Sequence, residues 1–327
     1  MTRAERYFVL KDKYKDDIEA FSEIERTLRK MEEHFTDHDR IMISVSGGSD
    51  SDCIVHLVCT YFAEYLDKIS FVFVNTGLEY AATKRHLCDL EAKYWIKIDR
   101  IRGESVVTAV RKYGVPILNK CKAKSISMYQ RGTPKGYWLI FERESDMFGF
   151  SENEKQLAQY CFDNHIMISQ KCCEVSKKKP IHDYCKQHNI DLDVSGERKS
   201  EGGARAAKNK SCFRQVDSGA DRFLPLFWWN DDVKATFKKA ENIRYSDCYE
   251  VWGMKRTGCV GCPFGKDTAE ELQMMMKYDP NLYKACMNVF GVAYELTDRF
   301  NCRKKKKLPE YVQLRLDFEE NEHGKDV

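Results

Sequence analysis

The chain has 327 residues, of which 43% are hydrophobic and 32% are charged, so it can build a sizeable core beneath a well-solvated surface. Its formal net charge of +3 is close to balance and lacks the strong basic excess of a dedicated nucleic-acid binder, although this does not exclude local basic patches. No apolar run approaches the length of about 18 residues that suggests a membrane-spanning helix, and residues 1–17 lack the apolar stretch of a signal peptide. We therefore expect a cytoplasmic protein with no membrane partner.

The first third of the chain alternates between predicted helices and strands. Apolar residues recur at three- and four-residue steps over 12–35, which predicts an amphipathic helix. Apolar periodicity and short β-rich runs then predict a strand at 40–45, a helix at 50–66, a strand at 69–74, a helix at 80–93 and a strand at 94–98. This alternation predicts an α/β fold with a doubly wound, mostly parallel sheet. In such sheets, ligands bind beyond the carboxyl ends of the strands.

The remainder is predicted to be mainly helical. The expected elements are helices at 105–113, 151–165 and through most of 231–300, and short strands at 137–141 and 192–195. We divide the chain into an N-terminal helical extension (1–38), an α/β domain (39–225), a helical part with a cysteine-bearing loop (226–300) and a basic, then acidic tail (301–327).

A glycine–serine turn, residues 46–51 (SGGSDS), separates the first predicted strand from the next helix. Glycines let the backbone approach an anion closely, and successive N–H groups at a helix N-terminus bind phosphate oxygens. A carboxylate in such a turn suits Mg²⁺ held against phosphates. The turn is not a Walker A loop, because no Gly-Lys-Ser/Thr follows, and the competing interpretation is a solvated turn. The candidate nucleotide-binding residues are Ser44, Ser46, Gly47, Gly48, Ser49, Asp50 and Ser51, with Asp50 also the candidate Mg²⁺ ligand.

This turn resembles the SGGxDS signature of the PP-loop, or N-type, ATP pyrophosphatases. Residues 75–79 (NTGLE) are similar to the second-strand motif of their sulfonucleotide (PAPS) reductase-like branch, which implies that Asn75, Thr76 and Gly77 help to bind the nucleotide. The resemblance covers about residues 40–265 and implies an adenine nucleotide alpha hydrolase-like fold. It also implies cleavage of ATP between the α- and β-phosphates, adenylating an acceptor. The bound group would be the pyrophosphate end of ATP or the phosphosulfate of a sulfonucleotide.

Residues 194–213 form a basic, glycine-containing segment with five Lys or Arg against two Glu. Arginine offers a planar fork that suits phosphate or sulfate, whereas composition alone fits a flexible basic loop equally well. Residues 196–205 are similar to an anion-binding loop of the same family. This resemblance implies that Arg198 and Arg205 contact the anionic part of the substrate, with Arg205 and Asp50 as catalytic candidates.

Fourteen cysteines are many for a cytosolic chain, and disulfides are not expected in a reducing compartment. Two close pairs, Cys172-Cys173 and Cys259-Val-Gly-Cys262, together supply four thiolates, which suit tetrahedral zinc or a cubane iron–sulfur cluster. Unligated thiols are the third interpretation. The CC…CxxC pattern resembles the site of adenylyl-sulfate reductases and of DNA phosphorothioation proteins, which implies a 4Fe–4S cluster on these four cysteines.

The resemblance fails at one point. Sulfonucleotide reductases carry a nucleophilic cysteine in a Glu-Cys-Gly-Leu-His motif near the C-terminus, and this sequence has no such motif. Its last cysteine, Cys302, stands beside basic residues that would lower its pKa, so it is the candidate substitute. A partner protein could also supply the thiol.

These features favour an ATP pyrophosphatase that uses ATP with Mg²⁺ and a 4Fe–4S cluster. The adenylated acceptor, a nucleic-acid backbone, a tRNA base or a small molecule, would then receive sulfur through the cluster or from a partner cysteine desulfurase or thiol donor. One alternative is a sulfonucleotide (APS/PAPS) reductase that releases sulfite. The other is a non-catalytic module that senses nucleotide and oxidation.

Overall fold

The computed structural model describes residues 1–145, 149–202, 210–265 and 267–302. Six strands form one sheet in the order β3-β2-β1-β4-β6-β5. Only the β5–β6 pair is antiparallel. The strands are β1 (Ile41–Ser44), β2 (Ile69–Asn75), β3 (Ile98–Arg102), β4 (Leu192–Val194), β5 (Phe213–Arg214) and β6 (Asp221–Phe223). The predicted α/β class with a mostly parallel sheet is confirmed.

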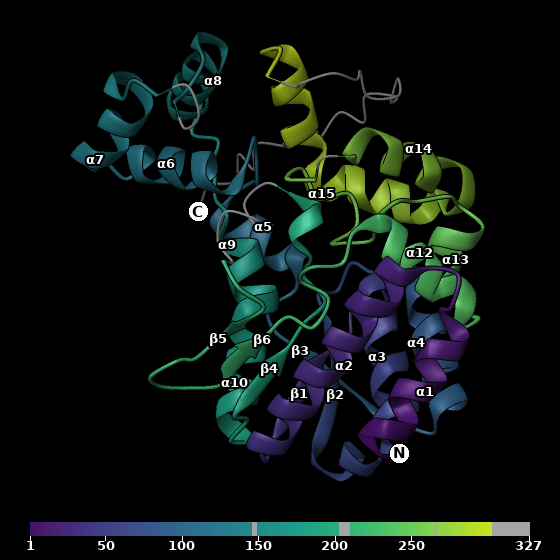
Figure 1. Cartoon of the computed structure of the whole chain (residues 1–327). Coiled ribbons are helices and arrows are strands. Elements are labelled where there is room, and N and C mark those ends of the chain that lie inside the picture. Colours follow the sequence, from purple (N-terminus) through teal and green to yellow (C-terminus); the bar gives the residue numbers. More distant parts are fainter. Residues whose placement is uncertain (146–148, 203–209, 266, 303–327) are drawn as a thin grey trace, which may run out of the picture.

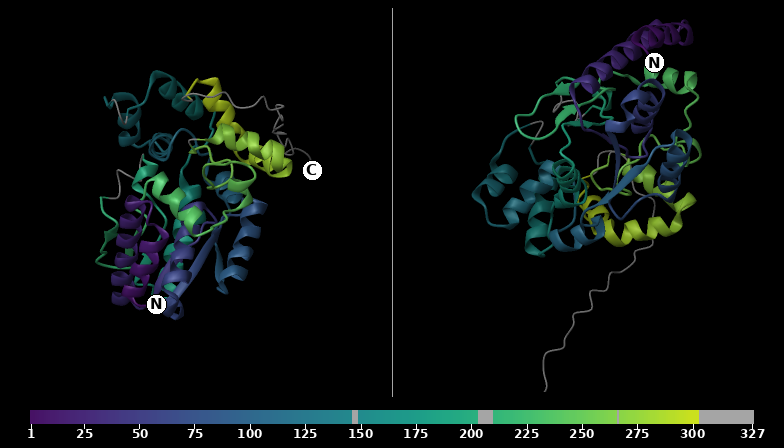
Figure 2. Two further views of the ribbon diagram at one scale, coloured as in Figure 1. Left: turned by 45° about the vertical axis from the view of Figure 1, so that its right-hand side comes forward. Right: turned by 90° about the horizontal axis from the view of Figure 1, so that it is seen from below.

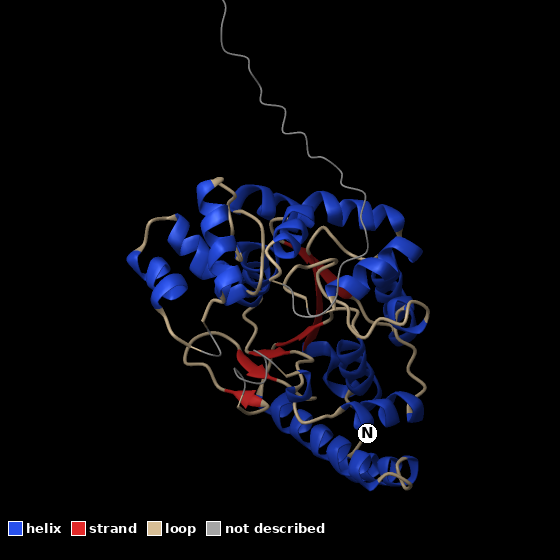
Figure 3. Ribbon diagram, turned by 90° about the horizontal axis from the view of Figure 1, so that it is seen from above, coloured by secondary structure: helices blue, strands red, loops and turns tan. Residues whose placement is uncertain are grey.

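Helices cover both faces of this sheet (Figures 1 and 3). The α-helices are α1 (Arg3–Lys13), α2 (Ile18–Asp37), α3 (Ser49–Tyr61), α4 (Ala81–Tyr94), α5 (Val106–Tyr113), α6 (Lys120–Gln130), α7 (Pro134–Tyr137), α8 (Glu152–Asp163), α9 (Lys171–Cys173), α10 (Lys179–Gln187), α12 (Asp231–Ala240), α13 (Asp247–Glu250), α14 (Thr268–Tyr278) and α15 (Pro280–Arg299). Short 3₁₀ or π turns are η1 (Ala63–Lys68), η2 (Trp138–Glu142), η3 (Glu174–Lys178) and η4 (Lys199–Glu201).

Side chains alternate across the sheet, as the pleat requires. Ile41 and Ile43 face one core, which contains buried residues of α2, α3 and α12. Met42 faces the other side, where it packs with Val72 and with Tyr184 of α10. Because both faces are covered, the central strands β1 and β2 are nearly continuous apolar runs. The N-terminal helix α2 belongs to the same core as the sheet.

Between β3 and β4 the chain makes a long helical excursion from α5 to α10. Its middle part (α6, α7, η2 and α8) forms a separate core around Ile126, Ile140 and Leu157, which also includes residues of α15. This part stands away from the sheet, beside α5 and α9, in both Figure 1 and Figure 2.

Three predicted elements were wrong. The helix at 12–35 is two helices, since α1 ends at Lys13 and Asp17 caps the start of α2. The strand at 94–98 is displaced to β3, because α4 continues to Tyr94 and Trp95 ends it in the left-handed region with φ 55°. The strand at 137–141 is helical, which allows the Tyr137 and Phe141 rings, four residues apart, to pack with centroids 5.0 Å apart.

None of the helices in the described ranges is both long enough and apolar enough to span a bilayer.

Candidate functional site

The turn at residues 46–51 lies at the carboxyl edge of the sheet, between β1 and α3. The Ser51 hydroxyl donates to the Gly48 carbonyl oxygen at 2.7 Å, and the Ser46 amide donates to the Ser51 hydroxyl at 3.2 Å. Ser49 begins α3, and no side chain of the described residues caps its N-terminus. The two serines therefore shape the loop and leave the N-terminus of α3 without a side-chain cap, the kind of helix end whose amides can bind an anion.

Gly47 is required by the conformation of this loop. Its φ of +66° is in the left-handed region, and a Cβ would lie 2.7 Å from Cγ2 of Thr83 on α4. The predicted glycine turn thus has a tight backbone that only glycine allows.

The Asp50 carboxylate is held by two basic side chains from distant segments. Its Oδ1 lies 2.9 Å from Nε of Arg198 and 2.7 Å from Nζ of Lys234. The Lys234 ammonium also donates to the Ser49 hydroxyl at 2.6 Å, and Arg198 also contacts Asp231 at 2.8 Å. The predicted Mg²⁺ ligand therefore already binds two cations that could themselves contact phosphate.

The second predicted motif forms the adjacent loop, after β2. The Glu79 carboxylate accepts hydrogen bonds from the Thr76 amide (3.0 Å) and hydroxyl (2.6 Å). Asn75 accepts one from the Gly77 amide at 2.9 Å, and Gly77 has φ +85°. Thr76 is fully buried, so its hydroxyl shapes the loop, whereas Gly77 is exposed at the edge of the sheet.

The loop after β4 closes the same edge from the other side. A Cβ on Gly196 would lie 3.1 Å from the Asp50 backbone, so this loop contacts the phosphate turn directly. Arg198 follows it and is only 7% exposed. The loops that follow β1 and β4 thus touch, and the loop that follows β2 lies at the same edge, as the strand order predicts. Arg205, the other predicted anion ligand, lies outside the described residues.

The four predicted cysteine ligands come from two segments that meet beside these loops. Cys172 and Cys173 lie on α9, and the thiol of Cys172 interacts with Cys173, Cys262 and Cys259. A hydrogen bond from Cys172, together with the nearby ammonium groups of Lys120 and Lys177, lowers the pKa of Cys173. Within the described ranges, no group of three or more Cys, His, Asp or Glu side chains is arranged so that it could hold a metal ion. The donor chemistry is compatible with a four-thiolate group, because Cys172 interacts with the other three thiols and Lys120 and Lys177 place positive charge beside Cys173.

Lys177 lies between a candidate cysteine ligand and the loop at residues 75–79. Burial acts to lower the pKa of its ammonium, but Cys259, to which it is hydrogen-bonded, and Glu79 outweigh burial and raise it. The same cation therefore lies close to a candidate cysteine ligand and to the carboxylate that shapes the second loop.

The CxxC turn is fixed by buried polar contacts. Tyr294 of α15 donates to the Gly261 carbonyl oxygen, and the Gly261 amide donates to Glu271 of α14 at 3.1 Å. Tyr80 donates to the same carboxylate. Burial raises the pKa of Glu271 to about 7. Since Tyr80 immediately precedes α4, this carboxyl connects the cysteine turn to the nucleotide loop.

The segment that precedes the CxxC turn also covers the phosphate loop. The Tyr249 hydroxyl accepts a hydrogen bond from the Thr257 amide at 3.0 Å. A Cβ on Gly48 would lie 3.2 Å from this hydroxyl and 3.3 Å from Oγ1 of Thr257. The segment that leads into the CxxC turn therefore also packs against the turn at residues 46–51, so the candidate cysteine site and the candidate phosphate site are neighbours.

The sequence matches one known protein family over more than half of its length. The model of the phosphoadenosine phosphosulfate reductase domain matches residues 40–131 and 135–265. The chain belongs to this family. It is thus a member of the PAPS reductase-like branch of the PP-loop proteins, as the sequence motifs predicted.

Two relatives each match more than half of this chain, and the chain spans less than half the length of the first. An uncharacterized protein of Methanocaldococcus jannaschii is 27% identical over 251 residues, 76% of this chain but only 41% of that protein. An adenosine 5′-phosphosulfate reductase of Neisseria meningitidis is 21% identical over 192 residues, 58% of this chain and 75% of the enzyme.

Two solved structures that match the chain at low identity are reported for comparison. A Candida auris PAPS reductase, in a phosphate complex, has 13% identity and a TM-score of 0.44, covering 71% of this chain and 87% of its own. A Methanococcus maripaludis U34-tRNA thiolase with its [4Fe-4S] cluster has 12% identity and a TM-score of 0.37, covering 87% and 82%.

The family motifs did not reveal Lys234, whose contacts with Asp50 and Ser49 place it in the phosphate site. It stands one turn into α12, after the Asn230 cap, and nothing in its local sequence distinguishes it from the other lysines of that helix. Only the packing of α12 beside α3 brings it to the phosphate loop. The sequence motifs did not single out Lys177 either.

Cys302 does not have the environment of a nucleophile. Its thiol packs beside Phe300, to whose carbonyl oxygen it donates at 3.5 Å. Burial, reinforced by Glu154, raises its pKa to about 11. The expectation that neighbouring basic residues lower this pKa was wrong, because burial dominates.

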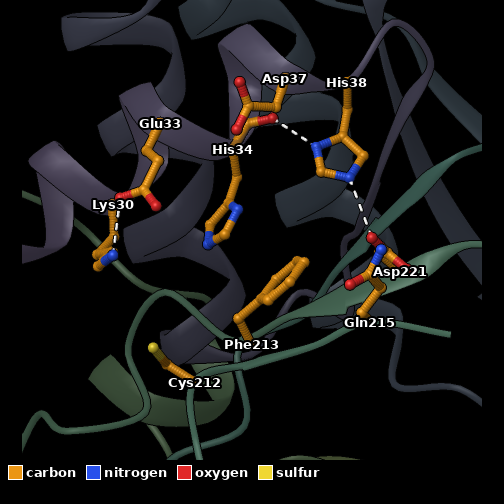
Figure 4. Close-up of a pocket in the computed structure, with 9 residues that line it drawn as sticks. All are labelled: Lys30, Glu33, His34, Asp37, His38, Cys212, Phe213, Gln215 and Asp221. Atoms are coloured by element: carbon orange, nitrogen blue, oxygen red, sulfur yellow. Dashed lines mark hydrogen bonds and ion pairs between the residues drawn. The ribbon is translucent and has the colours of Figure 1, made fainter.

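A separate cavity of about 450 Å³ lies beside β5 and the C-terminal half of α2 (Figure 4). Cys212 and Phe213, at the end of the 194–213 segment, help to line it, but none of its lining residues belongs to residues 46–51 or 75–79. The buried His34 ring stacks on Phe213 with centroids 4.1 Å apart. His38 pairs with Asp221 at 3.3 Å. Because its polar groups pair with one another, we assign this cavity no role in the phosphate site.

Proposed function

We propose that this protein is an ATP pyrophosphatase that adenylates an acceptor for sulfur insertion. The observation that carries the proposal is the phosphate loop itself, where Arg198 and Lys234 converge on Asp50 beside the N-terminus of α3. Two cations and a helix N-terminus suit a group with the high charge of pyrophosphate.

In the proposed reaction, an acceptor oxygen attacks the α-phosphorus of ATP. The bond from that phosphorus to the bridging oxygen breaks, and its electron pair leaves with pyrophosphate. The amides of Gly47 to Ser51 and the ammonium of Lys234 would stabilise the charge on this leaving group. The outer sulfur of a desulfurase persulfide then attacks the acceptor, and AMP leaves with the former acceptor oxygen. A thiol donor reduces the resulting disulfide, which leaves sulfur on the acceptor, releases the desulfurase cysteine and oxidises the thiol.

Mg²⁺ and an iron–sulfur cluster would be held by different residues. Phosphate oxygens entering the loop would compete for Arg198 and Lys234, which would free the Asp50 carboxylate for Mg²⁺. Cys172, Cys173, Cys259 and Cys262 would hold a 4Fe–4S cluster, which would supply an electron- or sulfur-handling centre next to the nucleotide.

Sulfonucleotide reduction is the second candidate, and the similarity to the meningococcal reductase favours it. It requires a nucleophilic thiolate, and the half-buried Cys302, with its raised pKa, does not fit that role. Under this alternative, a partner must bring the thiol.

A product assay separates these candidates. Anaerobically purified full-length protein would receive ATP with Mg²⁺, alone and with tRNA or DNA, and in parallel adenylyl sulfate or its 3′-phosphate with a thiol reductant. The proposal predicts AMP and pyrophosphate, lost in Asp50→Asn and reduced in Arg205→Ala. Sulfite release with ATP untouched would establish the reductase. Tight nucleotide binding without turnover of either substrate would indicate a sensing module.

A further inference from the structure

The helical excursion carries a basic stretch with no acidic residue. Between residues 120 and 138 there are five basic side chains and neither Asp nor Glu, in a chain whose net charge is only +3. The five are Lys120, Lys122, Lys124, Arg131 and Lys135. Lys122 is paired with Glu154 of α8, whereas the other four are exposed.

Two of these side chains lie on α6, and a third, Arg131, caps its C-terminus on the same side of the helix. Lys120, Lys124 and Arg131 are separated by four and seven residues, which places them within about 40° of one another around the helix axis. At the helical rise they span about 16 Å. Arg131 also donates to the Ser127 carbonyl oxygen, which fixes its guanidinium at the exposed end of the helix.

This basic face begins at the cysteine site. The ammonium of Lys120 is hydrogen-bonded to Cys173, one of the four clustered cysteines. From there the face runs along α6, away from the sheet, toward α7 (Figure 1). A polyanion bound along this face would therefore extend toward the candidate cysteine site.

Exposed aromatic rings lie at the far end of the basic face. A Cβ on Gly136 would lie 2.3 Å from the Tyr129 amide nitrogen, so α7 packs directly on the end of α6. Tyr137 packs against Phe141 but is 49% exposed. Trp138 is 47% exposed, and in the described part of the chain no other ring packs on it. Free aromatic faces beside cations suit unpaired bases, which can stack on them.

We propose that the surface formed by α6, α7 and Trp138 binds a single-stranded nucleic acid, with phosphates on Lys124, Arg131 and Lys135 and a base on Trp138. This inference rests on the proposed function and identifies the class of acceptor that the adenylating site would receive. The charge complementarity favours a polyanion over a neutral protein surface, and the rings favour bases over a lipid headgroup layer.

Fluorescence anisotropy of labelled single strands tests this directly, without ATP and therefore independently of turnover. The probes are RNA and DNA single strands of about 20 nucleotides, long enough for a typical binding track. Vesicles containing phosphatidylserine form a third arm. The variants are Lys124→Glu/Arg131→Glu/Lys135→Glu and Trp138→Ala. Thermal unfolding and circular dichroism verify that each variant folds.

We expect the triple variant to lose at least about tenfold in affinity, and its log–log salt slope to fall by about 2, since each lost phosphate contact removes about 0.7. Trp138→Ala should lose about tenfold with a smaller change in slope. Lys11→Glu/Lys15→Glu/Lys186→Glu, an equal charge change at exposed sites elsewhere, should bind as the wild type does.

Equal losses in the two triple variants, no binding of either strand, or binding of vesicles in place of strands would each overturn the proposal. Asp50→Asn separates it from the proposed function. Strand binding that persists in this variant, while ATP is never cleaved by any form of the protein, would retain the surface and reject the adenylating role.

Discussion

A buried glutamate behind the phosphate site allows a quantitative prediction. Glu241 ends α12, the helix that carries Lys234, and its side chain is only 3% exposed. Its carboxylate accepts hydrogen bonds from Lys13 and Tyr61 at 2.7 Å, Tyr14 at 2.8 Å and His56 at 3.0 Å. These contacts tie α12 to α1 and to α3, whose N-terminus forms part of the phosphate loop.

The hydrogen bonds to Glu241 determine in which direction and how far its pKa is shifted. Burial alone would raise the pKa of Glu241, but the donors, led by His56 and Lys13, lower it from 4.5 to about 2. Because the folded-state pKa lies below the unfolded one, the stabilisation is complete above about pH 4.5 and is lost as the pH falls toward 2. A shift of this size corresponds to about 3 kcal/mol of unfolding free energy.

Urea unfolding of Glu241→Gln, followed by circular dichroism at several pH values, measures this contribution. We expect a loss of about 3 kcal/mol at pH 7, which shrinks steadily below pH 4.5. Glu33→Gln, at an exposed site paired with Lys30, should change stability by less than about 0.5 kcal/mol. A loss at pH 7 no larger than this control, or one that does not depend on pH, would refute the argument.

Three further variants test the site. Lys234→Ala should weaken pyrophosphate inhibition by about 10- to 100-fold, because it removes a charge-assisted hydrogen bond worth about 1.5–3 kcal/mol. Gly47→Ala should destabilise the protein by at least about 1 kcal/mol in urea unfolding, since the left-handed φ and the contact at 2.7 Å both oppose a methyl group. Cys262→Ser should lower the iron and sulfide bound after anaerobic reconstitution.

Matched controls make these outcomes decisive. Lys238→Ala, one turn further along α12 and paired with Glu250, should leave pyrophosphate inhibition unchanged. Gly132→Ala, at φ +71° with open space around it, should cost less than the change at Gly47. Cys88→Ser, at an exposed site, should retain full iron. A control that behaves like its test variant would contradict the role assigned to that position.

The sheet and its binding edge could be predicted because their signals are local. β1 and β2 are short apolar runs, and the turns that follow them have glycines at the positions where φ is positive, Gly47 and Gly77. The parallel arrangement then places both turns at one edge. Residues such as Asp50 therefore follow from the motif and the fold class together.

Other features depend on contacts that no local pattern encodes. The run at residues 94–98 has the β-branched and aromatic composition of a strand, yet α4 continues through Tyr94 and leaves Trp95 94% exposed. Lys234 reaches Asp50 across 184 positions of the sequence, and only the packing of α12 beside α3 brings the two together. Two-residue β5 is too short to show any periodicity.

The central claim is that the phosphate loop cleaves ATP between its α- and β-phosphates. Exchange of labelled pyrophosphate into ATP tests it most directly, because adenylation of an acceptor is reversible and sulfonucleotide reduction produces no pyrophosphate. We expect exchange of pyrophosphate into ATP that requires Mg²⁺ and a nucleic-acid acceptor and that disappears in Asp50→Asn. Sulfite release from adenylyl sulfate, with no exchange under any of these conditions, would contradict it.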